Sequence, residues 1–123
     1  MVEKRAPKDP VHIPAAAGAF AKGNWSGSIA GGALDTEALI LFFASDDIGA
    51  GPGLHLHPYD EIFIVKMGRA RFTVGERVFE AGAGDVVMGP ATVPHRYENI
   101  GPGRLETIDI HLSREWIQTD LEG

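Results

Sequence analysis

The sequence predicts an all-β protein whose antiparallel strands form a sandwich or a barrel. Two observations support this fold class. Short runs rich in β-branched and aromatic residues follow one another at close spacing, and the 16 glycines and 8 prolines of the 123-residue chain supply turns between them. An apolar fraction of 44% and a charged fraction of 23% are ordinary for a globular protein, and the length predicts one domain over residues 1–123.

The N-terminal third is expected to contain a tail followed by strands and loops. Residues 1–10 hold two prolines and five charged residues, which predicts a mobile tail. Residues 11–44 should supply N-terminal strands and loops, with an extended "VHIP" and a loop "GNWSGSIAGG" in which Trp25 is a hydrophobic anchor. The run "EALILFFA" at 37–44 is apolar throughout, as expected of a strand covered on both faces.

Residues 45–112 are expected to form the barrel. The segments that favour strands here are 61–68, 70–74, 77–80, 84–89, 94–100 and 105–112. The two residues "GE" that follow Val74 suit a tight hairpin, and "GPG" at 101–103 predicts another turn. Residues 113–123 favour a short C-terminal helix, with Ser113 as its N-cap.

Charge and composition argue against several classes of partner. With 11 basic and 17 acidic residues the formal charge is −6, whereas binding to nucleic acid requires clustered Lys and Arg. The chain has no cysteine, which excludes disulfides and thiolate ligands. No apolar run approaches the ~20 residues that span a bilayer, and "AAAGAFAK" is unlike a signal peptide. We expect a cytoplasmic protein with neither a nucleic-acid nor a membrane partner.

Two of the five histidines lie in "GLHLHPYDEIFIV" at 53–65, where polar residues interrupt an apolar segment. His55 and His57 are two residues apart and would share one face of a strand. Glu61 has the same parity beyond an expected bend, and His95 begins a later strand. Three imidazoles and a carboxylate suit Fe(II), Mn(II), Ni(II) or Zn(II). The alternative is that these polar side chains face water.

The spacing around these residues resembles the two sequence signatures of the cupin superfamily. In "GAGPGLHLHPYDEIFIVKMG", the fixed positions of the first signature are filled by Gly49, His55, His57, Glu61 and Gly68. In "GDVVMGPATVPHRYEN", the second signature is matched by Gly84, Pro90, His95 and Asn99. Thr92 stands where the family usually has glycine, which puts the local backbone geometry in question and leaves the ligands intact.

The resemblance implies a fold, a cofactor and a range of activities. It implies an antiparallel β-barrel of jelly-roll type, inside which His55, His57, Glu61 and His95 bind one divalent metal ion. Cupins include dioxygenases, isomerases, epimerases, decarboxylases and lyases, and also non-catalytic ligand sensors, so the fold alone does not identify the reaction. If the metal were four-coordinate zinc, the same ligands could close its shell and leave a structural site.

The last predicted strand carries two further candidates, Asp109 and His111, on one face. Because His95 and Asp109 are nearly equidistant from the turn at 101–103, we expect them to be cross-strand neighbours facing the cavity. Asp109 could act as a general base or orient a ligand imidazole, and His111 could carry a proton. Tyr97 shares the parity of His95 and is either a third catalytic candidate or a core aromatic. A one-residue bulge would instead expose Asp109 and His111 to water.

Taken together, these features predict a metal-binding cupin that is an enzyme acting on a small polar organic molecule, with dioxygenase- or isomerase-type chemistry. The alternative is a non-catalytic barrel that binds or senses a small ligand, and a structural metal barrel is a third class. We also expect a homodimer, because small cupins commonly pair and residues 11–44 contain more apolar strand than a lone small barrel needs.

Overall fold

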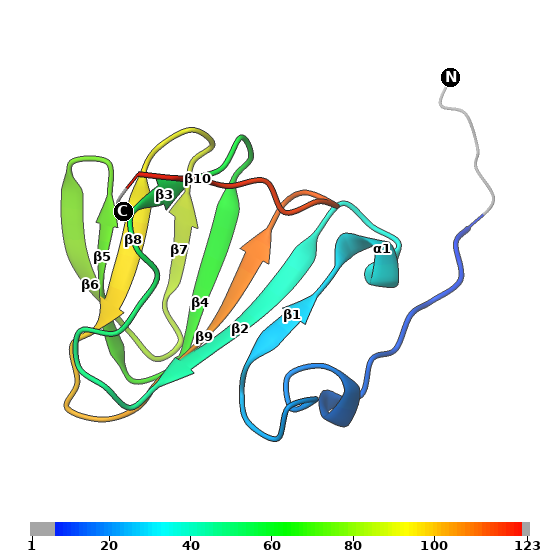
Figure 1. The fold of residues 1–123 in the computed structure, drawn as a ribbon, viewed down its shortest axis with the longest axis horizontal. Helices are drawn as coiled ribbons and strands as arrows, with labels where there is room; N and C mark the ends of the chain where they lie inside the picture. Colours follow the sequence, from blue (N-terminus) through cyan, green and yellow to red (C-terminus); the bar gives the residue numbers. More distant parts are fainter. Residues whose placement is uncertain (1–6, 122–123) are drawn as a thin grey trace.

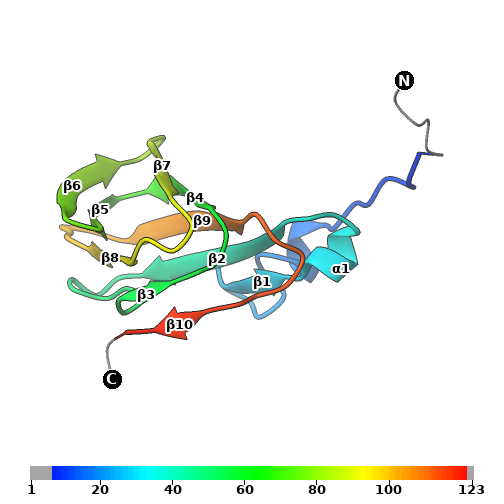
Figure 2. The same ribbon diagram turned by 90° about the horizontal axis from the view of Figure 1, so that it is seen from above.

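A computed structural model describes residues 7–121, in which two five-stranded antiparallel sheets dominate (Figure 1). The first sheet consists, in spatial order, of β1 (Gly27–Ile29), β2 (Leu39–Ser45), β9 (Leu105–His111), β4 (Glu61–Met67) and β7 (Val86–Gly89). The second consists of β10 (Thr119–Asp120), β3 (His55–Leu56), β8 (His95–Asn99), β5 (Arg69–Val74) and β6 (Arg77–Gly82). The two short strands β10 and β3 lie on one side of the molecule, opposite β6 and β7 (Figure 2).

One hydrophobic core joins the two sheets. Its buried side chains come from both of them: Phe63, Val65, Val87 and Leu105 from the first, and Ala70, Phe72, Ala81 and Tyr97 from the second. The prediction of an all-β antiparallel fold is therefore confirmed. The hydrogen bonding divides the strands into two sheets, so the predicted jelly-roll barrel is seen as two facing sheets and not as one continuous closed barrel.

The predicted C-terminal helix is wrong. Ser113 Oγ accepts a hydrogen bond from the Glu115 N–H at 3.1 Å, as an N-cap would, but no helix follows it up to residue 121. The backbone instead pairs with a distant segment through β10, and the Leu121 N–H donates to the Leu54 carbonyl at 3.0 Å. A helix of about eight residues is marginal by itself, so these long-range hydrogen bonds prevail.

The N-terminal region contains more regular structure than expected. The predicted loop "GNWSGSIAGG" includes the edge strand β1 and the first half of the short helix α1 (Gly31–Leu34), and a 3-10 turn, η1, covers Ala15–Ala17. The helix α1 and the turn η1 lie beyond the β1 edge of the first sheet (Figure 1). Residues 7–10 belong to no helix or strand, and the rest of the predicted tail, 1–6, lies outside the described residues. No helix between residues 7 and 121 is long and apolar enough to cross a membrane.

Trp25 is an anchor, as predicted. Its indole Nε1–H donates to the Thr107 carbonyl of β9 at 2.9 Å, and its ring packs edge-on against Phe20 and Phe42. The Lys66 ammonium lies 4.2 Å from the centre of the ring, within the range of a cation–π contact. Trp25 thus holds the N-terminal segment against the first sheet and covers one face of β2.

Thr92 takes the backbone conformation that glycine would take at its position in the second signature. Its φ is 68°, in the left-handed region, which costs an L-residue about 1–2 kcal/mol. The Thr92 N–H donates to the His57 carbonyl at 2.7 Å, and this hydrogen bond requires the turn. The departure from the family pattern therefore places a residue with a Cβ in a left-handed conformation, where glycine would not be strained.

Candidate metal centre

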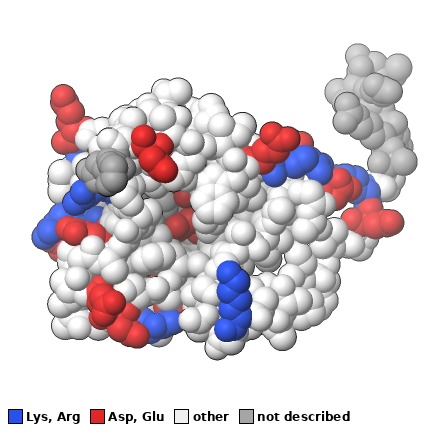
Figure 3. All heavy atoms as spheres, in the orientation of Figure 1, with Lys and Arg blue, Asp and Glu red and all other residues white. Residues whose placement is uncertain are grey.

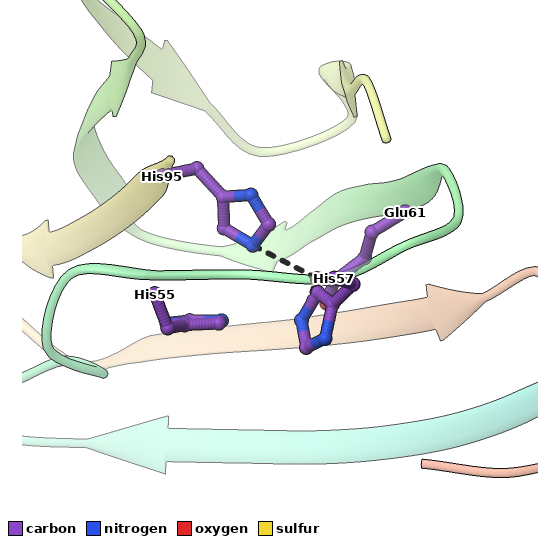
Figure 4. Close-up of side chains that lie close together, drawn as sticks. All are labelled: His55, His57, Glu61 and His95. Carbon is purple, nitrogen blue, oxygen red and sulfur yellow. Dashed lines mark ion pairs between the residues drawn. The ribbon is translucent and has the colours of Figure 1, made fainter. Parts of the chain in front are cut away.

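Four side chains from three parts of the chain converge at one end of the sandwich. His55 lies on β3, His57 follows it, Glu61 begins β4 and His95 begins β8. All four are buried, and one nitrogen or oxygen atom from each lies within 4.8 Å of the others. Their side chains point toward a common centre (Figure 4). The structure thus brings together the four predicted ligands.

Three of the four unpaired buried atoms of this cluster fit a cation, the fourth being His95 Nδ1. Glu61 Oε1 lies 3.1 Å from His57 Nε2 and 3.0 Å from His95 Nε2, the contact dashed in Figure 4. These three atoms are nevertheless buried with no hydrogen bond to any described residue. Burial of unpaired nitrogen and oxygen atoms is costly, and a shared cation would satisfy all three lone pairs. The donor set of three imidazoles and one carboxylate therefore fits a divalent metal ion.

Backbone carbonyls set the tautomers of two of the imidazoles. His55 Nδ1 lies 2.6 Å from the Gly53 carbonyl, and His57 Nδ1 lies 2.8 Å from the Ile117 carbonyl. A carbonyl only accepts, so each Nδ1 carries the proton and each Nε2 presents its lone pair to the centre. Both rings are thereby prepared to bind a metal through Nε2.

A hydrogen-bond chain through Tyr59 and His111 occupies the second oxygen of Glu61. The Tyr59 hydroxyl accepts from the Ile117 N–H at 3.1 Å, and it lies 2.7 Å from His111 Nδ1, to which it donates. His111 Nε2 then carries a proton and donates toward Glu61 Oε2, 3.1 Å away. Glu61 Oε1 is left for the metal. The sequence indicated that His111 faces the cavity, but its contact with Tyr59 depends on the fold and was not predicted.

The electrostatics of the cluster favour an ionised Glu61. Burial alone would raise the pKa of Glu61, but its contacts with His111, His57 and His95 outweigh burial and hold that pKa well below its usual range. Burial is the main cause that lowers the pKa of His55, helped by the neighbouring imidazoles. The centre therefore holds one carboxylate, and His55 is favoured in its neutral form, the form that binds metals.

Asp109 and Tyr97 form a second buried polar group next to the centre. The Tyr97 hydroxyl donates to Asp109 Oδ2 at 2.7 Å and lies 3.1 Å from Thr107 Oγ1, while Asp109 Oδ1 has no hydrogen bond to residues 7–121. Burial, and then the charge of Glu61, raises the pKa of Asp109 to about 7. Burial and Asp109 also raise the pKa of Tyr97 well above its ordinary value. Asp109 can therefore gain or lose a proton near neutral pH.

The raised pKa of Asp109 predicts a pH-dependent stability difference for Asp109→Asn in metal-free protein. Between about pH 4 and 7 the folded wild type keeps a proton that the unfolded chain has released, so this group's contribution to wild-type stability falls as pH rises. The asparagine side chain of the variant does not titrate. We expect the stability of the variant relative to wild type to increase by about 2 kcal/mol from pH 5 to pH 8 in urea unfolding. The same difference at both pH values would contradict the raised pKa.

One cavity of about 500 Å³ adjoins both groups. Its lining includes His55 and Glu61 of the centre together with the three catalytic candidates Tyr97, Asp109 and His111. Phe63 contributes an apolar wall, and Trp116 and Gln118 come from the segment that was predicted to be helical. These last two were missed because no local pattern shows that the C-terminal segment returns to the site.

The expected hairpin contact between His95 and Asp109 is wrong in detail. β8 pairs with β3 and β5, whereas β9 pairs with β2 and β4, so the two residues belong to opposite sheets. They still face the same interior, and Tyr97 of β8 reaches Asp109 of β9 across the core. The inward orientation of Asp109 and His111 thus results from sheet packing and not from strand pairing.

The two antiparallel sheets and the buried cluster of three histidines and one glutamate define a small β-sandwich protein with a candidate metal centre. Residues 43–111, more than half of the chain, match the family described as the cupin domain. The chain therefore belongs to the cupin family.

Three relatives illustrate what this chain is similar to. An uncharacterized protein of Streptomyces coelicolor is 37% identical over 54 residues, which are 44% of this chain and about half (51%) of that protein. Oxalate decarboxylase of Bacillus subtilis, in which Mn(II) centres have been studied, is similar with a TM-score of 0.69 and 26% identity over 76% of this chain and 27% of its own. An uncharacterized conserved protein with a double-stranded β-helix domain, from Klebsiella pneumoniae, has a TM-score of 0.64 at 19% identity, over 72% of this chain and 77% of its own, and supports the fold alone.

Proposed function

We propose that this cupin is a metal-dependent enzyme that acts on a small polar organic molecule, with oxygenase- or isomerase-type chemistry. The observation that carries the proposal is the single cavity shared by the candidate metal ligands and the buried, partly unpaired Asp109 carboxyl. A carboxyl whose pKa lies near neutral pH is well suited to proton transfer, which supports a catalytic role beyond binding alone.

The residues that line the site would have two roles, metal binding and proton transfer. His55, His57, Glu61 and His95 would hold the ion. When bound, a divalent metal supplies Lewis-acid or redox chemistry to a ligand beside it. Asp109 would accept or return a proton at Oδ1, while Tyr97 fixes the other oxygen of the same carboxyl. His111 keeps Glu61 oriented through its Nε2–H and is a candidate proton carrier.

The metal and the partners complete the proposal. The likeness to a decarboxylase with Mn(II) centres supports manganese among Fe, Mn, Ni and Zn. We propose a small-molecule ligand as partner and a cytoplasmic homodimer as the working form, with no nucleic-acid or membrane partner. Figure 3 shows acidic atoms inside a hollow near the middle of this face and a basic side chain below it, and such a hollow is consistent with a small-molecule ligand.

The test loads metal-free, untagged protein separately with Fe(II), Mn(II), Ni(II) and Zn(II). Each form is screened against small hydroxy, keto and carboxylic acids, oxalate included, for binding, O₂ uptake and product formation by NMR. We expect turnover of at least one compound by one metal form, and an at least about 100-fold lower rate in Asp109→Asn at unchanged metal content. Glu76→Gln, which removes an exposed carboxylate in the β5–β6 turn, is the matched control.

Two outcomes would overturn parts of this proposal. Metal-dependent binding of compounds without turnover of any of them would favour the non-catalytic ligand barrel. Full activity of Asp109→Asn would remove Asp109 from the mechanism, whatever the metal does.

A further inference from the structure

The C-terminal residues 113–121 run antiparallel along residues 54–60, the segment that carries His55 and His57. The contact begins where the Leu112 N–H donates to the Asp60 carbonyl at 3.0 Å. It continues through β10, where Thr119 is paired with Leu56, and ends where the Leu121 N–H donates to Leu54 at 3.0 Å. We call residues 113–121 the C-terminal strap.

The middle of the strap holds the candidate metal centre through a single residue. The Ile117 carbonyl accepts the Nδ1–H of His57 at 2.8 Å, and the Ile117 N–H donates to the Tyr59 hydroxyl at 3.1 Å. The first contact sets the tautomer of His57. The second orients the chain from Tyr59 through His111 to Glu61. Two residues of the centre therefore depend on the position of the Ile117 peptide groups.

The residues on either side of Ile117 line the cavity. Trp116 and Gln118 both contribute to its wall, and the Trp116 ring packs edge-on against His111 with the ring centres 5.5 Å apart. Trp116 Nε1–H donates to Gln118 Oε1 at 2.9 Å, which ties the two side chains together. One short stretch of chain therefore borders the cavity and orients the metal ligands at the same time.

The strap packs closely on the rest of the chain at its start and is exposed beyond Arg114. Arg114 pairs with Asp35 at 3.1 Å and Glu37 at 3.4 Å, and its backbone lies so close to Gly31 that a Cβ there would be 2.5 Å from Arg114 Cα. Residues 115–121 are all exposed, with Trp116 at 52% and Ile117 at 48%. A segment with so little buried apolar surface opens at a small fraction of the global unfolding free energy.

We propose that residues 115–121 form a gate that opens by local detachment beyond Arg114, and that this opening controls the exchange of metal and ligand at the centre. The inference rests on the proposed metal centre. When the strap is closed, the Ile117 peptide groups make hydrogen bonds to His57 and Tyr59. When the strap is open, both residues lose these hydrogen bonds. Because a metal binds the supported geometry more tightly, metal binding and strap closure stabilise each other.

A reversible crosslink tests the gate directly. The chain has no cysteine, so Leu56→Cys with Thr119→Cys introduces the sole pair of thiols. The two positions are directly opposite in the β3–β10 pair, where the Cα separation of antiparallel strands suits a disulfide. Co(II)-loaded protein is mixed with excess EDTA, and Co(II) loss is followed by its visible absorption. We expect Co(II) loss to be about tenfold slower when the disulfide is formed than when the same protein has been reduced and desalted.

A second variant tests the link without a crosslink. Tyr59→Phe keeps the ring that stacks on His57 but removes the hydroxyl between Ile117 and His111. We expect about tenfold faster Co(II) loss, with the unfolding midpoint of the metal-free protein lowered only by the loss of these hydrogen bonds. Glu115→Ala, an exposed strap position, is the control and should match wild type.

The outcomes separate the gate from the proposed function. Full Co(II) binding with equal loss rates in the oxidised, reduced and Tyr59→Phe proteins would overturn the gate and leave the metal centre standing. Failure of the wild type to bind Co(II) would overturn the metal centre, and the gate with it.

Discussion

Replacing Glu61 with glutamine is expected to weaken binding of a divalent metal by more than about 100-fold. Glu61 is the only carboxylate among the four candidate ligands, and its Oε1 atom lies within 3.1 Å of both His57 Nε2 and His95 Nε2. Glutamine has nearly the same shape, so the loss would come from charge and not from packing. Changes to residues that merely support a metal ligand cost about 10–100-fold, and loss of a charged ligand should exceed that. Competition titration with a chelating indicator measures the affinity.

Glu98→Gln is the matched control for this experiment. Glu98 lies on β8 near His95 but pairs with Arg71 at 3.3 Å on the outside of the sheet. Its loss changes the net charge of the protein by the same amount and should leave metal affinity within about twofold, because surface charges are screened. Similar affinities for the Glu61 and Glu98 variants would mean that Glu61 is not a ligand.

Gly51→Ala is expected to destabilise the fold by at least about 3 kcal/mol. A Cβ at residue 51 would lie 1.9 Å from the carbonyl oxygen of Tyr97 and 2.8 Å from its carbonyl carbon. Both atoms belong to the backbone of β8, so no side-chain rotation relieves the clash and the strand itself must move. Because β8 carries His95 and Tyr97, the variant should also bind metal less tightly.

Gly32→Ala provides the control for the glycine prediction. Apart from its chain neighbours and the backbone of its own helix, nothing in the described part of the chain lies within 4 Å of a Cβ at residue 32, and alanine is favoured in the helix α1. We expect a change within about 1 kcal/mol of wild type in urea unfolding. Equal stabilities of the two alanine variants would show that the loop at Gly51 is farther from β8 than the structure places it.

The sequence predicted the parts of the fold that depend on local pattern. Strand alternation placed His55 and His57 on one face, and the bend at 58–60 kept Glu61 in step with them. The hairpin of β5 and β6 was expected from the two residues between them, and Val74 is indeed paired with Arg77. His95 was already a candidate because it begins a later predicted strand, and the family signatures linked it to the first segment, which no local pattern does.

The sequence could not predict contacts between segments that are distant along the chain. His95 and Asp109 are nearly equidistant from the turn at 101–103, which suggested that β8 and β9 pair. Each strand instead pairs with two other strands, and β8 and β9 lie in opposite sheets. The C-terminal residues show a helical pattern, yet their backbone groups are satisfied by residues 54–59. The roles of Tyr59 and Ile117 follow from that contact and became visible only in three dimensions.

The metal content of untagged protein, purified without a metal column, tests the central claim most directly. Elemental analysis should find close to one divalent ion per chain in the wild type, either as purified or after anaerobic loading and desalting. It should find almost none in Glu61→Gln treated in the same way. This result would establish that the four buried side chains form a metal centre. A wild type that retains no metal under any loading condition, or a Glu61 variant that retains as much as the wild type, would contradict it.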